Sequence, residues 1–147
     1  MSLADLRFKL YFGLVKKVSL WTRQRRMRQM IGRMKLERGV KVLDLGGLAS
    51  IWRDAPGPLQ ITLLNLPGTP MTPEIGEHHF SYLEGDACKV EGLGDKSYDM
   101  VFSNSVIEHV GPEEQQEAFA HEVRRLGRSY WVQTPAIWFP IEAHTGM

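Results

Sequence analysis

The stretch VLDLGGLASIW, residues 42–52, decides the fold of this chain. Its apolar residues alternate with an aspartate and then run into two glycines, a pattern that predicts a buried strand breaking into a sharp turn. Gly46 and Gly47 allow the backbone to turn tightly and to pass close to a ligand, because glycine has no side chain. The glycine pattern G-x-G-x-x-G of dinucleotide-binding proteins is absent, which disfavours a nicotinamide-dependent oxidoreductase.

Four further apolar runs follow, and each of them predicts a short strand. The five predicted strands cover residues 41–45, 60–66, 79–85, 98–104 and 129–134. A helix is expected between the last two strands, because Pro112 suits a first helical position, Glu113 and Glu114 complement the positive N-terminus, and Gly127 can close the helix. Alternation of strand and helix favours parallel strands with right-handed crossovers, and hence a doubly wound α/β sheet that binds its ligand at the carboxyl ends of the strands.

The charge is divided unevenly along the chain of 147 residues. Residues 1–41 hold twelve Lys and Arg against two acids, net +10, whereas the remainder holds six against fifteen, net −9. Leucines and methionines at helical spacing predict two basic amphipathic helices over residues 3–36. Such a basic segment can bind phosphates or an anionic membrane. Alternatively it forms a solvated helix face or a face that packs against the acidic remainder of the chain. We therefore divide the chain into a basic helical segment, 1–38, and a Rossmann-like domain, 39–147.

The composition narrows the class of protein. A hydrophobic content of 43% with 10% aromatic residues is enough for the core of one soluble domain. The apolar run LYFGLV, residues 10–15, ends at Lys16 and is far shorter than the ~18 residues of a membrane span, so neither an anchor nor a signal peptide is expected. The single cysteine, Cys88, excludes an internal disulfide and fits a reducing compartment, so we expect a cytoplasmic protein. A nucleic-acid partner is not favoured.

Polar side chains stand at the ends of successive predicted strands. Asp44 ends the first strand, where an acid repels a pyrophosphate and attracts a ligand that carries an ammonium or sulfonium. Asn65 ends the second strand, twenty-one positions later, close to where a ribose-binding residue stands in nucleotide-binding α/β folds. Asp86 follows the third strand, and Asn104 and Ser105 follow the fourth. Each of these residues alone could be a turn or cap residue, but together they are expected to line one rim of the sheet.

The stretches VLDLGG, GDA, YDMVFSNSVIEHV and YWVQTP resemble, in this order, the motifs of class I S-adenosylmethionine-dependent methyltransferases, in particular the methyltransferase type 11 group. The similarity spans about residues 40–145. It implies that S-adenosylmethionine is the cofactor and that eight residues form its site: Asp44, Gly46, Gly47, Asn65, Asp86, Ala87, Asn104 and Ser105. In the family's arrangement the first three hold the methionine end, the residue ending the second strand takes the ribose hydroxyls, GDA meets the adenine, and Asn104 lies beside the methyl donor.

The resemblance also implies the sheet order 3-2-1-4-5 and shows where this sequence departs from the family. Leu48 and Ser50 stand where further glycines are usual, and Asn65 stands where an acid is more usual, so we expect weaker cofactor binding. The family's sheet normally has seven strands, whereas this sequence ends just after the fifth. The fifth strand would then be a bare edge, which we expect to be covered by the C-terminal segment, by the N-terminal helices or by a second copy in a homodimer.

Methyl transfer from a sulfonium depends on orientation more than on protein chemistry and requires no metal. No metal site is predicted, because His78 and His79 are adjacent in a predicted strand and would point to opposite faces. His109 is the candidate general base for a hydroxyl acceptor, with Glu108 and His144 behind it. The alternative for His109 is a helix-face histidine bonded to the backbone.

Two classes of function stay open. The first is an S-adenosylmethionine-dependent methyltransferase that acts on a small-molecule, glycan or lipid-like acceptor. The second is a cofactor-binding module without activity of its own, which needs a partner chain or the missing strands. The sequence lacks an Asn/Asp-Pro-Pro-Tyr element after the fourth strand, and this absence disfavours amide and adenine N-methylation.

Overall fold

Residues 21–74 and 76–134 are described by the computed structural model. The chain divides into two units, Met1–Leu36 and Glu37–Met147. The described part of the first unit is helical over residues 21–34. The first of the two predicted basic helices lies outside the described residues, as does His144. Among the described residues, no helix is both long enough and apolar enough to cross a membrane.

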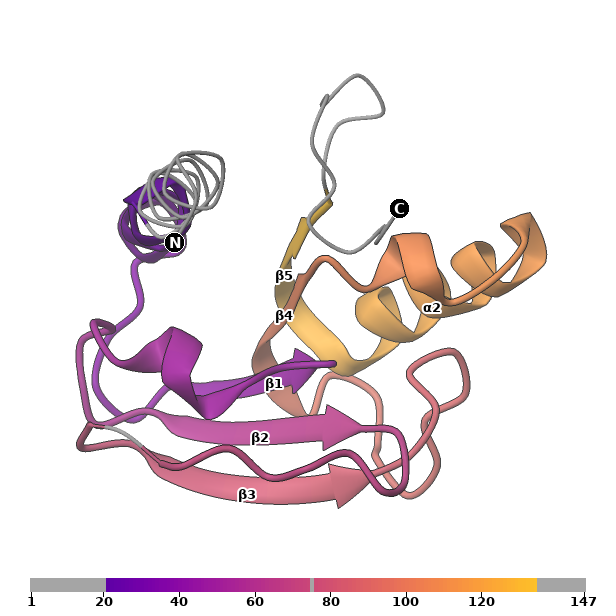
Figure 1. Ribbon diagram of the computed structural model, residues 1–147, viewed down its shortest axis with the longest axis horizontal. Helices are drawn as coiled ribbons and strands as arrows, with labels where there is room; N and C mark the ends of the chain where they lie inside the picture. The colour runs from indigo at the N-terminus through magenta and orange to yellow at the C-terminus, as the bar shows by residue number, and fades with distance from the viewer. Residues whose placement is uncertain (1–20, 75, 135–147) are drawn as a thin grey trace, which may run out of the picture. The chain divides into compact units, whose positions relative to one another are not determined.

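The second unit is built on a five-stranded parallel sheet (Figure 1). Its strands are β1 (Lys41–Leu45), β2 (Gln60–Asn65), β3 (His79–Glu84), β4 (Tyr98–Asn104) and β5 (Gly127–Gln133). The spatial order is β3-β2-β1-β4-β5, and every neighbouring pair is parallel. The five predicted strands and the predicted order are confirmed. From β1 the chain first adds β2 and β3 on one side of the sheet and then returns to add β4 and β5 on the other side. Parallel α/β sheets bind their ligands at such a switch point, here between β1 and β4.

The helix α2 (Glu113–Leu126) packs on one face of this sheet and closes the main core. It ends at Leu126, with Gly127 as its C-cap, which confirms the predicted end, but it begins at Glu113, so Pro112 is the N-cap and not the first helical residue. Its buried side chains share one apolar cluster with strand residues: Phe119, Val123 and Leu126 from α2, and Leu43, Leu45, Leu64 and Val101 from the strands. Each large apolar side chain buried in this way contributes about 1.5–3 kcal/mol. The cluster therefore binds β1, β2 and β4 to the helix.

The other crossovers contain no α-helix in the described residues. The β1–β2 connection holds the 3-10 helix η1 (Ala49–Trp52), and a second 3-10 helix, η2 (Ile107–His109), lies between β4 and α2. The described residues of the β2–β3 and β3–β4 connections are loops. Four prolines and glycines within residues 66–74 account for the first of these loops, since both residue types disfavour a helix interior.

The β3–β4 loop is fastened to α2 by Arg125. The guanidinium of Arg125 lies 2.7 Å from a carboxylate oxygen of Glu122 and 3.1 Å from one of Asp95. It also donates hydrogen bonds to the backbone oxygens of Val90 and Leu93, at 3.0 and 2.8 Å. The hydrogen bond from Arg125 lowers the pKa of Glu122. The loop that begins near Asp86 is thereby held at its far end by a network in which every charge is paired.

β3 and β5 form the two edges of the described sheet. The position of β5 agrees with the expectation that the fifth strand is an edge. Tyr130 on this strand is 52% exposed. The segment expected to cover it, residues 135–147, lies outside the described residues.

Candidate cofactor-binding site

The turn after β1 depends on two glycines. Gly46 has a φ of +72°, in the left-handed region that favours glycine, and its N–H donates to the backbone oxygen of Leu64 at 2.8 Å. A Cβ at Gly46 would lie 2.6 Å from Cγ2 of Val106, and a Cβ at Gly47 would lie 1.9 Å from Oδ2 of Asp44. The sequence therefore needs glycine at both positions to form this turn.

Asp44 lies against Gly47 and is wholly buried. Its Oδ2 accepts a hydrogen bond from Nε1 of Trp52 at 2.8 Å. Its Oδ1 is buried without a hydrogen-bond partner among the described residues. Burial raises the pKa of Asp44 from 3.8 to about 7, against the opposing effect of the hydrogen bond from Trp52. The charged form is thus costly here, and a ligand cation near Oδ1 would stabilise it.

Trp52 is held in place by two contacts that sequence reasoning missed. Its ring packs edge-on against Phe102, with the centroids 5.0 Å apart. Its backbone oxygen accepts a hydrogen bond from Nε2 of His78 at 2.8 Å, while Nδ1 of His78 accepts from the N–H of Leu59 at 3.2 Å. Because Nδ1 accepts from Leu59, Nε2 is the ring nitrogen that donates to Trp52. The only indication in the sequence was an aromatic residue eight positions after Asp44, within the stretch that opens the domain.

A cavity of about 370 Å³ opens at the carboxyl ends of β1, β2 and β3. This volume falls within the range of roughly 300–1,000 Å³ that is usual for small-molecule sites. Leu64, Leu66, Val106 and Val110 give the cavity apolar walls. Five of the ten predicted site residues line it together: Gly46, Asn65, Asp86, Ala87 and His109.

Asn65 and Asp86 supply the acceptor atoms of this cavity. Nδ2 of Asn65 donates to the backbone oxygen of Gly47 at 3.1 Å, which orients the amide and leaves Oδ1 to accept from a ligand hydroxyl. Oδ1 of Asp86 accepts from the N–H of Cys88 at 2.8 Å, in a tight turn that holds the carboxylate at the exposed lip. A ligand with a hydroxyl pair and an amine matches these two side chains.

The other five predicted site residues do not line this cavity: Asp44, Gly47, Asn104, Ser105 and Glu108. Ser105 has a φ of +58°, and its N–H donates to the backbone oxygen of Gln133 at 2.8 Å. Oδ1 of Asn104 accepts from Nε2 of Gln133 at 3.4 Å. Oε2 of Glu108 accepts from the hydroxyl of Thr134 at 3.0 Å. Asn104, Ser105 and Glu108 therefore connect the end of β4 with the end of β5. The roles of all five residues at the candidate site stay predictions.

The two candidate catalytic residues, His109 and Glu108, are adjacent on η2 but lie in different surroundings. The side chain of His109 is exposed and reaches the lip of the cavity. Glu108 is bound to Thr134 instead. The structure therefore brings only His109 to the candidate site.

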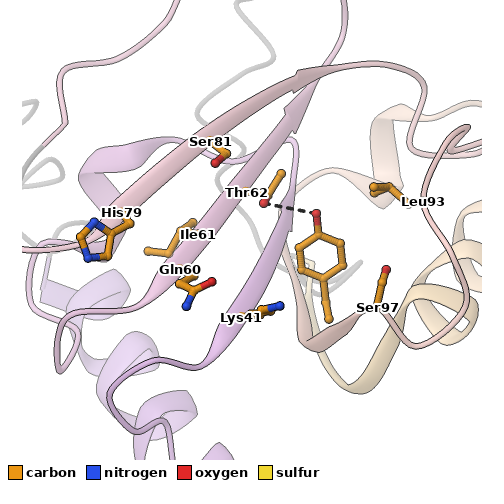
Figure 2. Close-up of a pocket in the computed structure, with 9 residues that line it drawn as sticks. Lys41, Gln60, Ile61, Thr62, His79, Ser81, Leu93 and Ser97 are labelled. Atoms are coloured by element: carbon orange, nitrogen blue, oxygen red, sulfur yellow. Dashed lines mark hydrogen bonds between the residues drawn. The ribbon is translucent and has the colours of Figure 1, made fainter.

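Two further hollows occur among the described residues. One of about 220 Å³ shares Asn65, Leu66 and Thr69 with the first cavity. The other, of about 500 Å³, lies at the amino ends of the strands, where the hydroxyl of Tyr98 donates to Oγ1 of Thr62 at 3.2 Å (Figure 2). Parallel α/β sheets bind ligands at the carboxyl ends, so the cavity of Gly46 is the candidate site. Within residues 21–74 and 76–134, no three His, Cys, Asp or Glu side chains are grouped to hold a metal ion.

Solved structures of three other proteins are similar to part of this chain, and the first of them supports the fold. A methyltransferase from an antibiotic biosynthesis pathway of Anabaena variabilis has a TM-score of 0.54 at 19% identity, over 74% of this chain and 44% of that one. An S-adenosylmethionine-dependent methyltransferase from Methanosarcina mazei has a TM-score of 0.49 at 14% identity, over 66% of this chain and 53% of that one. A methyltransferase in complex with the Haloferax volcanii activator Trm112 also has a TM-score of 0.49, at 19% identity, over 77% of this chain and 57% of that one.

The chain thus spans less than half the length of the Anabaena protein. A search of curated proteins finds no significant match. Residues 59–129 match the family described as a methyltransferase domain, of the type 11 group. This match confirms the resemblance to the methyltransferase type 11 group over residues 59–129, and the strand order shows a Rossmann-like fold.

Proposed function

We propose that this domain binds S-adenosylmethionine and directs its methyl group to a small-molecule, glycan or lipid-like acceptor. One observation carries the proposal: a cavity lined by Gly46, Asn65 and Asp86 lies at the carboxyl ends of the strands, in a chain whose residues 59–129 match the methyltransferase domain family. The cofactor supplies an activated methyl group, so the protein's own residues need mainly to bind and orient the reactants.

The residues of the cavity fit an adenosylated amino acid. Oδ1 of Asn65 accepts from a ribose hydroxyl, and the carboxylate of Asp86 accepts from the adenine amine. The turn at Gly46 and Gly47 gives the amino-acid end a close approach to the backbone. The buried carboxyl of Asp44 attracts the positive charge of this end through the thin wall that the glycines make.

His109 is the proposed general base where the acceptor is a hydroxyl. Of the two titratable side chains of η2 it is the one that lines the cavity, and it does so at an exposed position. General-base assistance typically contributes about 10²–10⁴-fold to a rate. An acceptor that loses no proton during methylation would not need this residue.

Cofactor affinity gives the first test. Calorimetry on the folded chain is expected to show binding of both S-adenosylmethionine and its demethylated product. Asp86→Ala removes an acceptor for the adenine amine and is expected to cost about 1–3 kcal/mol, or roughly 5- to 150-fold in affinity. Glu91→Ala removes a carboxylate from the same loop, 81% exposed and outside the cavity, and should leave the affinity unchanged.

The outcomes of this titration separate the candidate functions. An absence of binding by either nucleoside to the folded chain would sink the proposal, as would equal effects of the two substitutions. Binding without methyl transfer to any class of acceptor would instead support a cofactor-binding module that needs a partner chain or further strands.

We also propose that β5 pairs with β5 of a second copy. β5 is an edge of the described sheet, an edge strand presents unpaired backbone groups, and Tyr130 on this strand is exposed. Light scattering is expected to give a mass that rises toward a dimer with concentration. Tyr130→Lys should shift that equilibrium toward monomer, whereas Ser97→Lys, in the exposed β3–β4 loop, should not. A constant monomer mass for the unsubstituted chain would contradict the pairing.

A further inference from the structure

The helix over residues 21–34 and the residue that follows it carry a cationic surface that the proposed methyl transfer does not use. Its six exposed cations are Arg23, Arg25, Arg26, Arg28, Arg33 and Lys35. Residues 21–36 contain no acid. Among the salt bridges that the structure describes, none involves one of these six side chains. A group of exposed cations without neutralising carboxylates is suited to an anionic partner.

The arrangement of this helix separates an aromatic cationic side from an apolar side. Trp21, Arg25 and Arg28 stand at i, i+4 and i+7 and so share one face. Trp21 is 55% exposed, and the guanidinium carbon of Arg25 lies 5.7 Å from the centroid of its ring. Met27 and Met30 are buried and, by the helical period, stand on the opposite side. The exposed face therefore presents a large aromatic ring followed along the helix by two arginines.

The sequence that precedes this helix favours a lipid surface over a nucleic acid as the anionic partner. Residues 8–21 contain nine apolar or aromatic residues and three lysines, with no acid. Basic segments rich in aromatic and aliphatic residues are typical of membrane-surface binding, and tryptophan is enriched at the level of the lipid headgroups. Contact with nucleic-acid phosphates would use the arginines but would not require the apolar residues.

We propose that residues 21–35 bind the surface of an anionic phospholipid membrane, with the arginines on the headgroup phosphates and Trp21 at headgroup depth. Each cation close to an anionic surface strengthens binding about fivefold. The attraction is screened by salt, because the Debye length falls from about 30 Å at 0.01 M to about 3 Å at 1 M. This inference is independent of the cofactor site, which lies in the other unit.

Co-sedimentation of the full chain with vesicles tests the proposal. Binding is expected to vesicles of phosphatidylcholine mixed with phosphatidylserine at low salt, with release at high salt and little binding to pure phosphatidylcholine. Arg25→Gln combined with Arg28→Gln should weaken the partitioning about 25-fold, at about fivefold for each lost cation. Lys89→Gln combined with Arg124→Gln removes the same charge from exposed positions of the other unit and should leave the partitioning nearly unchanged.

Trp21→Ala provides a second variant that keeps every cation, and it should weaken the partitioning severalfold. Circular dichroism on each variant verifies that the helix and the sheet are retained. The absence of binding to phosphatidylserine vesicles at low salt would overturn the proposal, as would equal losses in the two double variants. Salt-sensitive binding of duplex DNA that depends on Arg25 and Arg28, without vesicle binding, would assign the surface to nucleic acid instead.

Discussion

Gly47→Ala is expected to abolish measurable cofactor binding and to destabilise the second unit. The added Cβ would lie 1.9 Å from Oδ2 and 2.0 Å from Cγ of Asp44. The carboxyl cannot give way easily, because it is fully buried and bound to Trp52. The turn itself must therefore move, and Gly46 of this turn lines the candidate cofactor cavity. Overpacking of this kind costs about 1–3 kcal/mol, and occasionally more.

Urea unfolding and calorimetry with the demethylated cofactor measure the two effects. Gly94→Ala is the matched control, since a Cβ at Gly94 would meet no atom within 4 Å and the backbone there does not adopt a positive φ. It should change neither stability nor affinity. Retention of normal stability and affinity by Gly47→Ala would contradict the role given to this turn.

The fold was predictable because its elements are marked by local signals. Apolar runs bounded by Gly and Pro gave all five strands, and the end signals at Pro112 and Gly127 gave α2. The strand order is a property of long-range pairing, which no local pattern contains, and it followed only from the resemblance to a known family. The 3-10 character of η1 was also missed, since four residues are too few to show a helical period.

The candidate site was predictable to the extent that it depends on strand ends. Asn65 and Asp86 meet at one cavity because the carboxyl ends of parallel strands lie at the same edge of the sheet. The hydrogen bond that Trp52 donates to Asp44 could not be predicted, because it depends on how the chain turns between β1 and η1. The separation of His109 from Glu108 likewise depends on where Thr134 lies after β5, far away in sequence.

Asp44→Asn is expected to stabilise the protein above neutral pH and to weaken cofactor binding at the same time. Burial raises the pKa of Asp44 from 3.8 to about 7. A carboxyl whose pKa is raised by folding holds its proton more tightly in the folded state. Its contribution to stability is therefore most favourable below pH 3.8 and is lost as the pH rises to about 7. At about 1.36 kcal/mol per pH unit, the loss above pH 7 is about 4 kcal/mol.

The substituted side chain is neutral at every pH and keeps an oxygen that can accept from Nε1 of Trp52. Urea unfolding from acid to alkaline pH should therefore show two curves that separate between pH 3.8 and about 7, with the variant the more stable at the alkaline end. Asp54→Asn, at an exposed position just after η1, is the matched control and should follow the unsubstituted protein. Parallel curves for Asp44→Asn and the unsubstituted protein would show that the buried carboxyl does not titrate in this range.

Calorimetry on the same variant then distinguishes a structural role for Asp44 from a binding role. A carboxyl that serves only to pack beneath the turn would give the gain in stability with no loss of affinity for S-adenosylmethionine. A carboxyl that attracts the positive charge of the cofactor would give both the gain in stability and a loss of affinity. The negative charge of Asp44 destabilises the folded protein because it is buried, and the same charge attracts the cofactor. We expect both effects, since Oδ1 of Asp44 lacks a hydrogen-bond partner among the described residues and the turn at Gly47 lies directly against the carboxyl.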